Sequence, residues 1–170
     1  IVMTKWAGLE GTSIIAAEKE EKLLETLPQE LVDVAKGFKE YLSVIPESKI
    51  AMEVGVSAMH DVTEGGVFGA LWELGEASGV GITAHLDKIP IKQETIEVCE
   101  VFKINPYMLI SSGSMMIGCE KGNLLVEKLE EAGINAAVIG RATEGNDRIV
   151  VSRDETRYIG PAGSDELYKI

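Results

Sequence analysis

The sequence predicts an α+β fold, in which helices pack against a mixed β-sheet. The chain opens on a strand-like apolar run, Ile1 to Lys5. Helical and strand-like segments then follow without the strict alternation that builds a doubly wound parallel sheet. With 170 residues, 45% of them apolar, the chain is long enough to bury a core. It shows no linker or repeat, so we expect one domain over residues 1–170.

Apolar residues spaced three and four apart predict the helices. In chain order these segments are Ile14–Leu27, Leu31–Leu42, Pro46–Val54, 66–78, Glu94–Phe102 and 123–132. Gly79 and Gly133 follow the fourth and the last of them, at the position where a left-handed C-cap commonly ends a helix. The glycine-containing stretch "AGLEGTS", residues 7–13, is predicted to be a loop.

Short apolar or alternating runs bounded by turn residues predict the remaining strands. They are 55–59, the first half of 81–91, two segments around the Ser-Ser-Gly turn in 108–122, 134–140, and a hairpin over 147–161.

The net charge of −12 and the isoelectric point near 4.6 argue against binding to nucleic acid or to anionic lipid. No apolar run reaches the roughly 20 residues of a membrane span, so we expect no membrane contact. Cys99 and Cys119 lie in unlike contexts and are predicted to be buried thiols in a reducing compartment. His60 and His85 are too few and too far apart to indicate a metal site. These features favour a cytoplasmic protein.

The stretch "HDVTEGGVFG", His60 to Gly69, leads into the fourth helix. Thr63 can cap that helix, yet Gly66 stands where a capping box would place glutamate. Gly65 and Gly66 would leave the first amides unshielded, and such a helix end attracts phosphate or another oxyanion. The alternative is an Asx-turn formed by Asp61 before an ordinary helix, with a glutamate matching the helix dipole.

The longer stretch "AMHDVTEGGVFGALWELGEASGVGI" resembles the signature of the C-terminal domain in the AIR synthase (PurM) superfamily. The HypE-like branch of hydrogenase expression and formation proteins is the nearest in pattern. Three further segments agree in order: "TKWAGLEGTSIIA", "INPYMLISSGSMMIGCEKG" and "LEEAGINAAVIGRATEG". The resemblance extends over nearly the whole chain, with these four segments in register.

The resemblance implies a two-domain parent whose N-terminal domain, absent from this chain, holds Mg2+ and ATP and forms a homodimer. The C-terminal domain then closes over the phosphates and a second substrate, to support phosphoryl activation of an oxygen. Maturation partner proteins are further implied. No residue is assigned a catalytic or metal-binding role, and this chain alone is expected to be inactive. The residues implied to face phosphate or substrate are Asp61, Thr63, Gly65 and Gly66, with Gly8, Gly11 and Thr12 on a second loop.

Two departures limit what the resemblance implies. Glu64 stands where several relatives carry arginine, and the chain ends "DELYKI" without the terminal cysteine of HypE. The specific carbamoyl chemistry is therefore not implied. A non-catalytic binding module of the same fold, a purine-pathway synthetase or a thiamine-phosphate kinase remain alternatives. If the helix end faces phosphate, Gly66→Glu in the parent should abolish ATP turnover and leave the fold intact.

Overall fold

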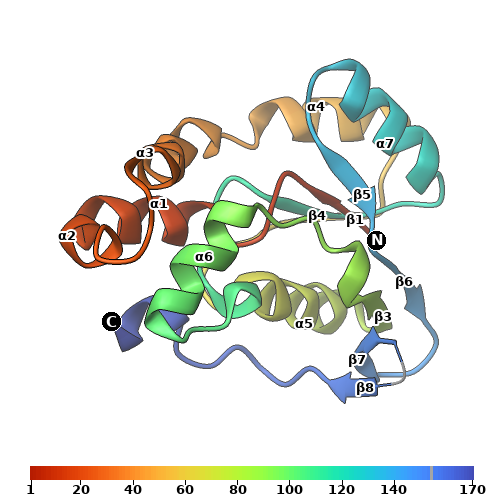
Figure 1. Ribbon diagram of the computed structural model, residues 1–170. Helices are drawn as coiled ribbons and strands as arrows, with labels where there is room; N and C mark the ends of the chain where they lie inside the picture. The colour runs from red at the N-terminus through yellow and green to blue at the C-terminus, as the bar shows by residue number, and fades with distance from the viewer. Residues whose placement is uncertain (154) are drawn as a thin grey trace.

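The computed structural model describes residues 1–153 and 155–170, and over these residues it contains helices and two four-stranded sheets (Figure 1). The α-helices are α1 (Leu9–Glu18), α2 (Glu20–Leu23), α3 (Gln29–Gly37), α4 (Ile45–Val54), α5 (Gly66–Ser78), α6 (Gln93–Phe102) and α7 (Gly122–Glu131). Short 3-10 helices are η1 (Phe38–Tyr41), η2 (Leu86–Lys88), η3 (Pro106–Met108) and η4 (Glu166–Lys169). The predicted α+β class is confirmed.

The first sheet is antiparallel throughout and has the order β2-β4-β1-β5. Its strands are β1 (Val2–Thr4), β2 (Ala58–Asp61), β4 (Met115–Gly118) and β5 (Ala136–Val138). Because side chains alternate along a strand, neighbours in β1 serve opposite faces. Val2 packs in the cluster beneath α4 and α7, whereas Met3 packs toward α5.

The second sheet has the order β6-β3-β7-β8 and is mixed, because β3 and β7 run parallel and the other pairs are antiparallel. Its strands are β3 (Gly81–His85), β6 (Gly140–Thr143), β7 (Arg148–Ser152) and β8 (Glu155–Tyr158). Strands β7 and β8 form the predicted hairpin, apart from Asp154, which lies outside the described residues.

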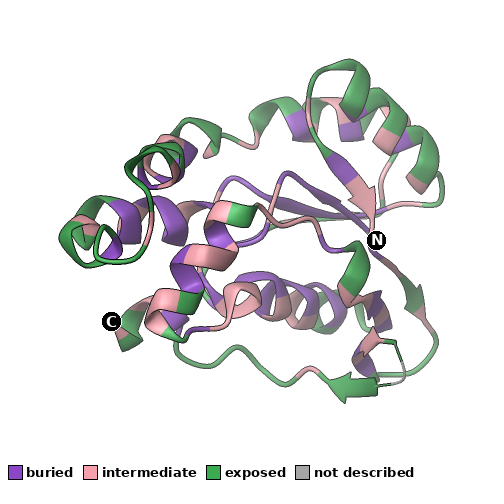
Figure 2. Ribbon diagram, in the orientation of Figure 1, coloured by how far each residue is buried: buried purple, intermediate pink, exposed green. Residues whose placement is uncertain are grey.

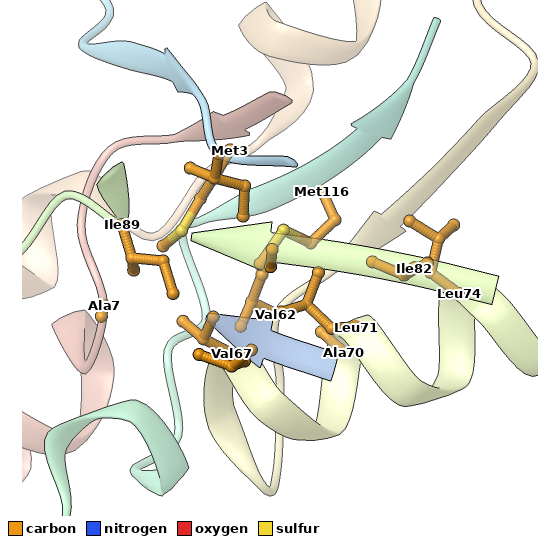
Figure 3. Packing of buried hydrophobic residues seen from close by; sticks show 13 residues of the cluster. Met3, Ala7, Val62, Val67, Ala70, Leu71, Leu74, Ile82, Ile89 and Met116 are labelled. Carbon is orange, nitrogen blue, oxygen red and sulfur yellow. The ribbon is translucent and has the colours of Figure 1, made fainter. Parts of the chain in front are cut away.

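Helix α5 contributes to a core shared with both sheets, which explains why it is apolar on more than one side (Figure 2). The side chains of this core come from β1, β4, α5, β3, β7 and the loop between β2 and α5, and they lie together (Figure 3). They include Met3, Val62, Val67, Leu71, Leu74, Ile82 and Met116. The N-terminal end of α5 is thereby held at a fixed place relative to the two sheets.

Two further apolar clusters complete the packing. Buried residues of α4, α7 and the first sheet form one of them, including Ala51, Leu125 and Leu129. Buried residues of α1, α3 and α6 form the other, which Leu109 joins from the segment between η3 and β4. Among the described residues, no helix combines the length and the apolar composition that crossing a membrane requires.

Three local predictions were wrong. The stretch predicted as a loop over residues 7–13 already contains the start of α1 at Leu9, because Gly8 takes a left-handed conformation and serves as the N-cap. Residues 108–110 form no strand, since η3 and an extended segment occupy that part. Cys119 is only half-buried, although Cys99 is buried as predicted.

Candidate functional site at the start of helix α5

The loop from β2 to α5 places its polar side chains outward and its glycines inward. Asp61 is exposed and Thr63 half-buried, whereas Val62, between them, is in the core. Gly65 is the N-cap of α5 and has a left-handed backbone with φ of 79°. The prediction that Thr63 caps the helix with its side chain is therefore wrong. Its carbonyl instead accepts a 3.0 Å hydrogen bond from the Gly66 N–H.

The expectation of unshielded amides at this helix end is wrong for Gly65. Its N–H donates to the carboxylate of Asp165 at 2.7 Å. The other carboxylate oxygen of Asp165 accepts from Ile110 N at 3.2 Å and from Leu167 N at 2.9 Å. Asp165 is only 3% exposed. An anionic group does lie at the start of α5, and the protein itself supplies it.

Gly66 is glycine because backbone from another segment lies against it. A Cβ at this position would come within 2.7 Å of the carbonyl oxygens of Leu109 and Tyr107. Its φ of 60° is also in the left-handed region. The expectation that Gly66→Glu leaves the fold intact is therefore wrong, since any side chain there collides with the backbone of residues 107–109.

The second predicted loop, which the structure shows to be the start of α1, contacts the same segment. Gly8 N donates to the Ser111 hydroxyl at 2.6 Å, and Gly11 N donates to Ile110 O at 2.9 Å. A Cβ on Gly11 would lie 2.4 Å from Leu109. Thr12 is fully buried.

Gly11 and Thr12 therefore contact buried residues of the protein itself. The Thr12 hydroxyl is hydrogen-bonded at 3.0 Å to that of Thr95 on α6. The structure brings the β2–α5 loop and the start of α1 together around residues 109–111, with Asp61 and Thr63 the members most open to solvent. That these residues face phosphate stays a prediction.

Sequence reasoning missed the C-terminal segment, residues 159–170, which passes over the start of α5 (Figure 1). Besides Asp165, Glu166 accepts from Asn105 N at 3.3 Å, and the Tyr168 hydroxyl donates to Glu64 at 2.7 Å. A local signal existed, because Asp165 also caps η4 in the manner of an aspartate before a helical turn. Nothing local could reveal its partner on α5.

A cavity of about 500 Å³ adjoins this site. It lies between the first turn of α5, η3, the β7–β8 hairpin and the C-terminal segment. Phe68 and Tyr107, which stack with ring centroids 5.6 Å apart and an interplanar angle of 16°, form part of its lining. Burial raises the pKa of Tyr107, so its hydroxyl stays protonated in neutral solution.

His60 is engaged outside this cavity. Its Nε2 lies 3.2 Å from a Glu73 carboxylate oxygen on α5, and its Nδ1 is 2.5 Å from the carbonyl oxygen of Asp61. Within residues 1–153 and 155–170, no three His, Cys, Asp or Glu side chains are grouped as a metal ion requires.

Known proteins resemble this chain over part of their length. A protein of Methanocaldococcus jannaschii named for hydrogenase expression and formation is 32% identical over 153 residues, covering 84% of this chain and 45% of the relative. The carbamoyl dehydratase HypE of Rhodobacter capsulatus is 23% identical over 139 residues, covering 79% of this chain and 38% of the relative. The chain thus spans about half the length, or less, of the curated relatives it matches.

Solved structures share the fold. The crystal structure of E. coli HypE superposes with a TM-score of 0.79 at 22% identity, over 99% of this chain and 52% of that one. HypE in its complex with HypF gives 0.73 at 18% identity, over 95% and 52%. HypE in complex with ATP gives 0.72 at 15% identity, over 98% and 51%.

The predicted family is confirmed by residues 1–152, which match the family described as AIR synthase related protein, C-terminal domain. The match includes the start of α1 and the β2–α5 loop, and it ends at the last residue of β7. The chain belongs to the AIR synthase related family.

Proposed function

We propose that this chain is the C-terminal half of an ATP-dependent, HypE-like protein that activates an oxygen of a second substrate by phosphoryl transfer. Membership of the family, relatives named for hydrogenase maturation and a fold shared with ATP-bound HypE support the proposal. The chain's match to about half of each HypE structure supports a preceding domain. In the proposal that domain supplies the Mg2+ ligands.

The observation that carries the proposal is the anionic group at the start of α5. The N–H groups of Gly65 and Ile110 already hold a carboxylate there. These N–H groups are occupied by Asp165, but their arrangement supports a preference for oxyanions at this end of the helix. A phosphate would therefore bind beside the Asp165 carboxylate and not in its place. In the proposal the phosphates lie along the open side of this loop, toward Asp61 and Thr63.

Each part of the loop has a role that its geometry supports. The exposed carboxylate of Asp61 would orient the substrate oxygen or receive its proton, and Thr63 would donate a hydrogen bond to phosphate. Gly65 and Gly66 allow the close approach of backbone. Gly8, Gly11 and Thr12 would act by fixing residues 109–111 beside the loop, because they are buried. Such positioning is most of what phosphoryl transfer asks of a protein.

The similarity to HypE also supports a proposal about protein partners. HypE is known in a complex with HypF, which supports a maturation partner for the full-length parent of this chain. A homodimer formed through the N-terminal domain is part of the proposal. Sedimentation of the full-length protein, alone and with its candidate partner, tests both.

Asp61→Asn in the full-length parent tests the site. The change is isosteric and exposed, so we expect an unaltered unfolding midpoint together with ATP turnover lowered at least about tenfold. Asp87→Asn on η2, likewise an exposed aspartate, is the matched control and should leave turnover unchanged. Equal turnover in both variants would remove Asp61 from the site. Absence of any ATP turnover by the folded parent would favour the non-catalytic module.

A further inference from the structure

We propose that the cavity beside α5 is a binding site for a neutral, planar aromatic molecule of fused-ring size. Its volume, about 500 Å³, falls within the range of small-molecule sites. Its walls come from five separate parts of the fold: α5, η2, η3, the β7–β8 hairpin and the C-terminal segment. This site does not require the proposed ATP chemistry, because it lies within this chain; of the phosphate-facing set only Gly65, through its backbone, lines the cavity.

The wall chemistry selects an aromatic occupant. Phe68 and Tyr107 present a stacked pair of rings at the cavity, and Leu86, Met108 and Val150 add apolar surface around it. A flat ring gains dispersion and quadrupole contacts from such a wall that a puckered ring of equal volume does not.

The polar groups of the lining select a ligand that forms hydrogen bonds. The hydroxyls of Tyr107 and Ser152 are uncommitted in the contacts among described residues. Asn105 uses its side-chain oxygen to accept from Tyr107 N, which leaves its amide N–H groups for another partner. A few such groups in an apolar pocket fix the orientation of a ligand.

The charges at the rim favour a neutral ligand. Among the described residues that line the cavity, the charged ones are Glu155 and Arg157 on β8, and they pair with each other at 2.8 Å. Their fields largely cancel, so a charged ligand would lose its hydration without finding an unpaired counter-ion.

The cavity also depends on close contact between α5 and the C-terminal segment. A Cβ on Gly69 would lie 3.2 Å from the Cβ of Ala162, and one on Gly65 would lie 2.9 Å from it. The buried Asp165 carboxylate anchors that segment. The wall is thus part of the fold, and no second copy or partner chain is needed to form the site.

The proposal is tested by titrating the 170-residue chain with 2-naphthol in the absence of nucleotide. Binding is monitored through the NMR chemical shifts of the backbone amides. We expect saturable shifts at Phe68, Gly69 and Tyr107. Decahydro-2-naphthol keeps the hydroxyl and the size but is not flat. Its affinity should be lower than that of 2-naphthol by at least about tenfold. Equal affinity for the two probes, shifts mapping elsewhere, or no shifts at the solubility limit would each overturn the proposal.

Variants distinguish binding to the Phe68–Tyr107 ring pair from non-specific hydrophobic binding. Tyr107→Ala should weaken 2-naphthol binding about tenfold, and Tyr107→Phe should give an intermediate loss because it keeps the ring and removes the hydroxyl. Should Tyr107→Ala fail to fold, Phe68→Leu removes a ring and keeps apolar volume. Tyr41→Ala, which removes one ring of the separate Trp6–Tyr41 pair, is the control and should bind like the wild type. Undiminished binding to the folded Tyr107 and Phe68 variants would contradict the assignment.

Discussion

The carboxylate of Asp165 lies 2.7 Å from the backbone nitrogen of Gly65, from which 100 residues of chain separate it. This contact satisfies a donor at the N-cap of α5 and puts a negative charge at the positive end of the helix dipole. The same side chain also accepts from Ile110 N and Leu167 N. One carboxylate therefore joins α5, the segment before β4 and the C-terminal segment.

Asp165→Ala should destabilise the protein markedly. The Asp165 residue is only 3% exposed, and the change would leave three N–H groups without their acceptor. We therefore expect a loss of roughly 2–4 kcal/mol in the free energy of unfolding. Urea denaturation of the 170-residue chain measures it. Asp87→Ala, at an exposed aspartate on η2, should change stability by less than about 0.5 kcal/mol. Similar losses in the two variants would show that the Asp165 contacts contribute little.

Gly66→Ala should cost more than Gly79→Ala, although both glycines have left-handed backbone. At Gly79 a Cβ would meet nothing within 4 Å, so the substitution adds only backbone strain of about 1 kcal/mol. At Gly66 the new Cβ would also press on the Leu109 and Tyr107 carbonyls, for a further loss of roughly 2–3 kcal/mol. Thermal and urea unfolding of both variants give the difference. A difference near zero would mean that the backbone of residues 107–109 can shift to make room for the Cβ without loss of stability.

Local pattern was enough to predict α5 and the β7–β8 hairpin. Apolar spacing and Gly79 gave the length of the helix, because both the buried face and the left-handed cap are properties of neighbouring residues. The exposed strand β6 was missed, since residues 140–143 show no apolar alternation and its place beside β3 is a tertiary relation.

The start of α5 could not be predicted in the same way. From sequence, Gly65 and Gly66 looked like a bare helix end, because the residues that cover them lie elsewhere in the chain. Asp165 covers the first, and the backbone of residues 107–109 lies against the second. A glycine that is required for close approach gives the same sequence pattern whether a ligand or another segment of the chain approaches it.

The buried thiol of Cys99 should make stability fall at alkaline pH. Burial raises its pKa from 9.0 to about 12, with a smaller contribution from Glu166. Below pH 9 the thiol is protonated in both states, so its contribution is fully present there. Between pH 9 and about pH 12 only the unfolded chain loses the proton, and that contribution is lost.

At pH 10 we expect a loss of about 1.4 kcal/mol relative to pH 8 that Cys99→Ala does not show. The measurement is the difference between the two proteins in the pH dependence of urea unfolding, which removes effects of other groups. Parallel curves for wild type and variant would mean that Cys99 ionises as readily in the folded protein as in the unfolded chain.

Lys5 is a buried cation held by four oxygens from three other parts of the chain. Its Nζ donates to Tyr41 O and Ser43 O at 2.7 Å and to Gly113 O at 2.8 Å, and it lies 2.5 Å from Oε1 of Glu47. Glu47 is fully buried. Removing the ammonium would therefore leave both a buried carboxylate and three carbonyls without their partner.

We expect Lys5→Met to lower the free energy of unfolding by about 3–5 kcal/mol, the range seen when one member of a buried pair is removed. Adding Glu47→Leu should recover part of the loss, because the second change removes the stranded charge. The double variant should therefore lose less than the sum of the single losses. The exposed pair Lys22–Glu25 is the control, and Lys22→Met should cost less than about 1 kcal/mol. Strict additivity of Lys5→Met and Glu47→Leu in urea unfolding would show that the two charges do not stabilise each other.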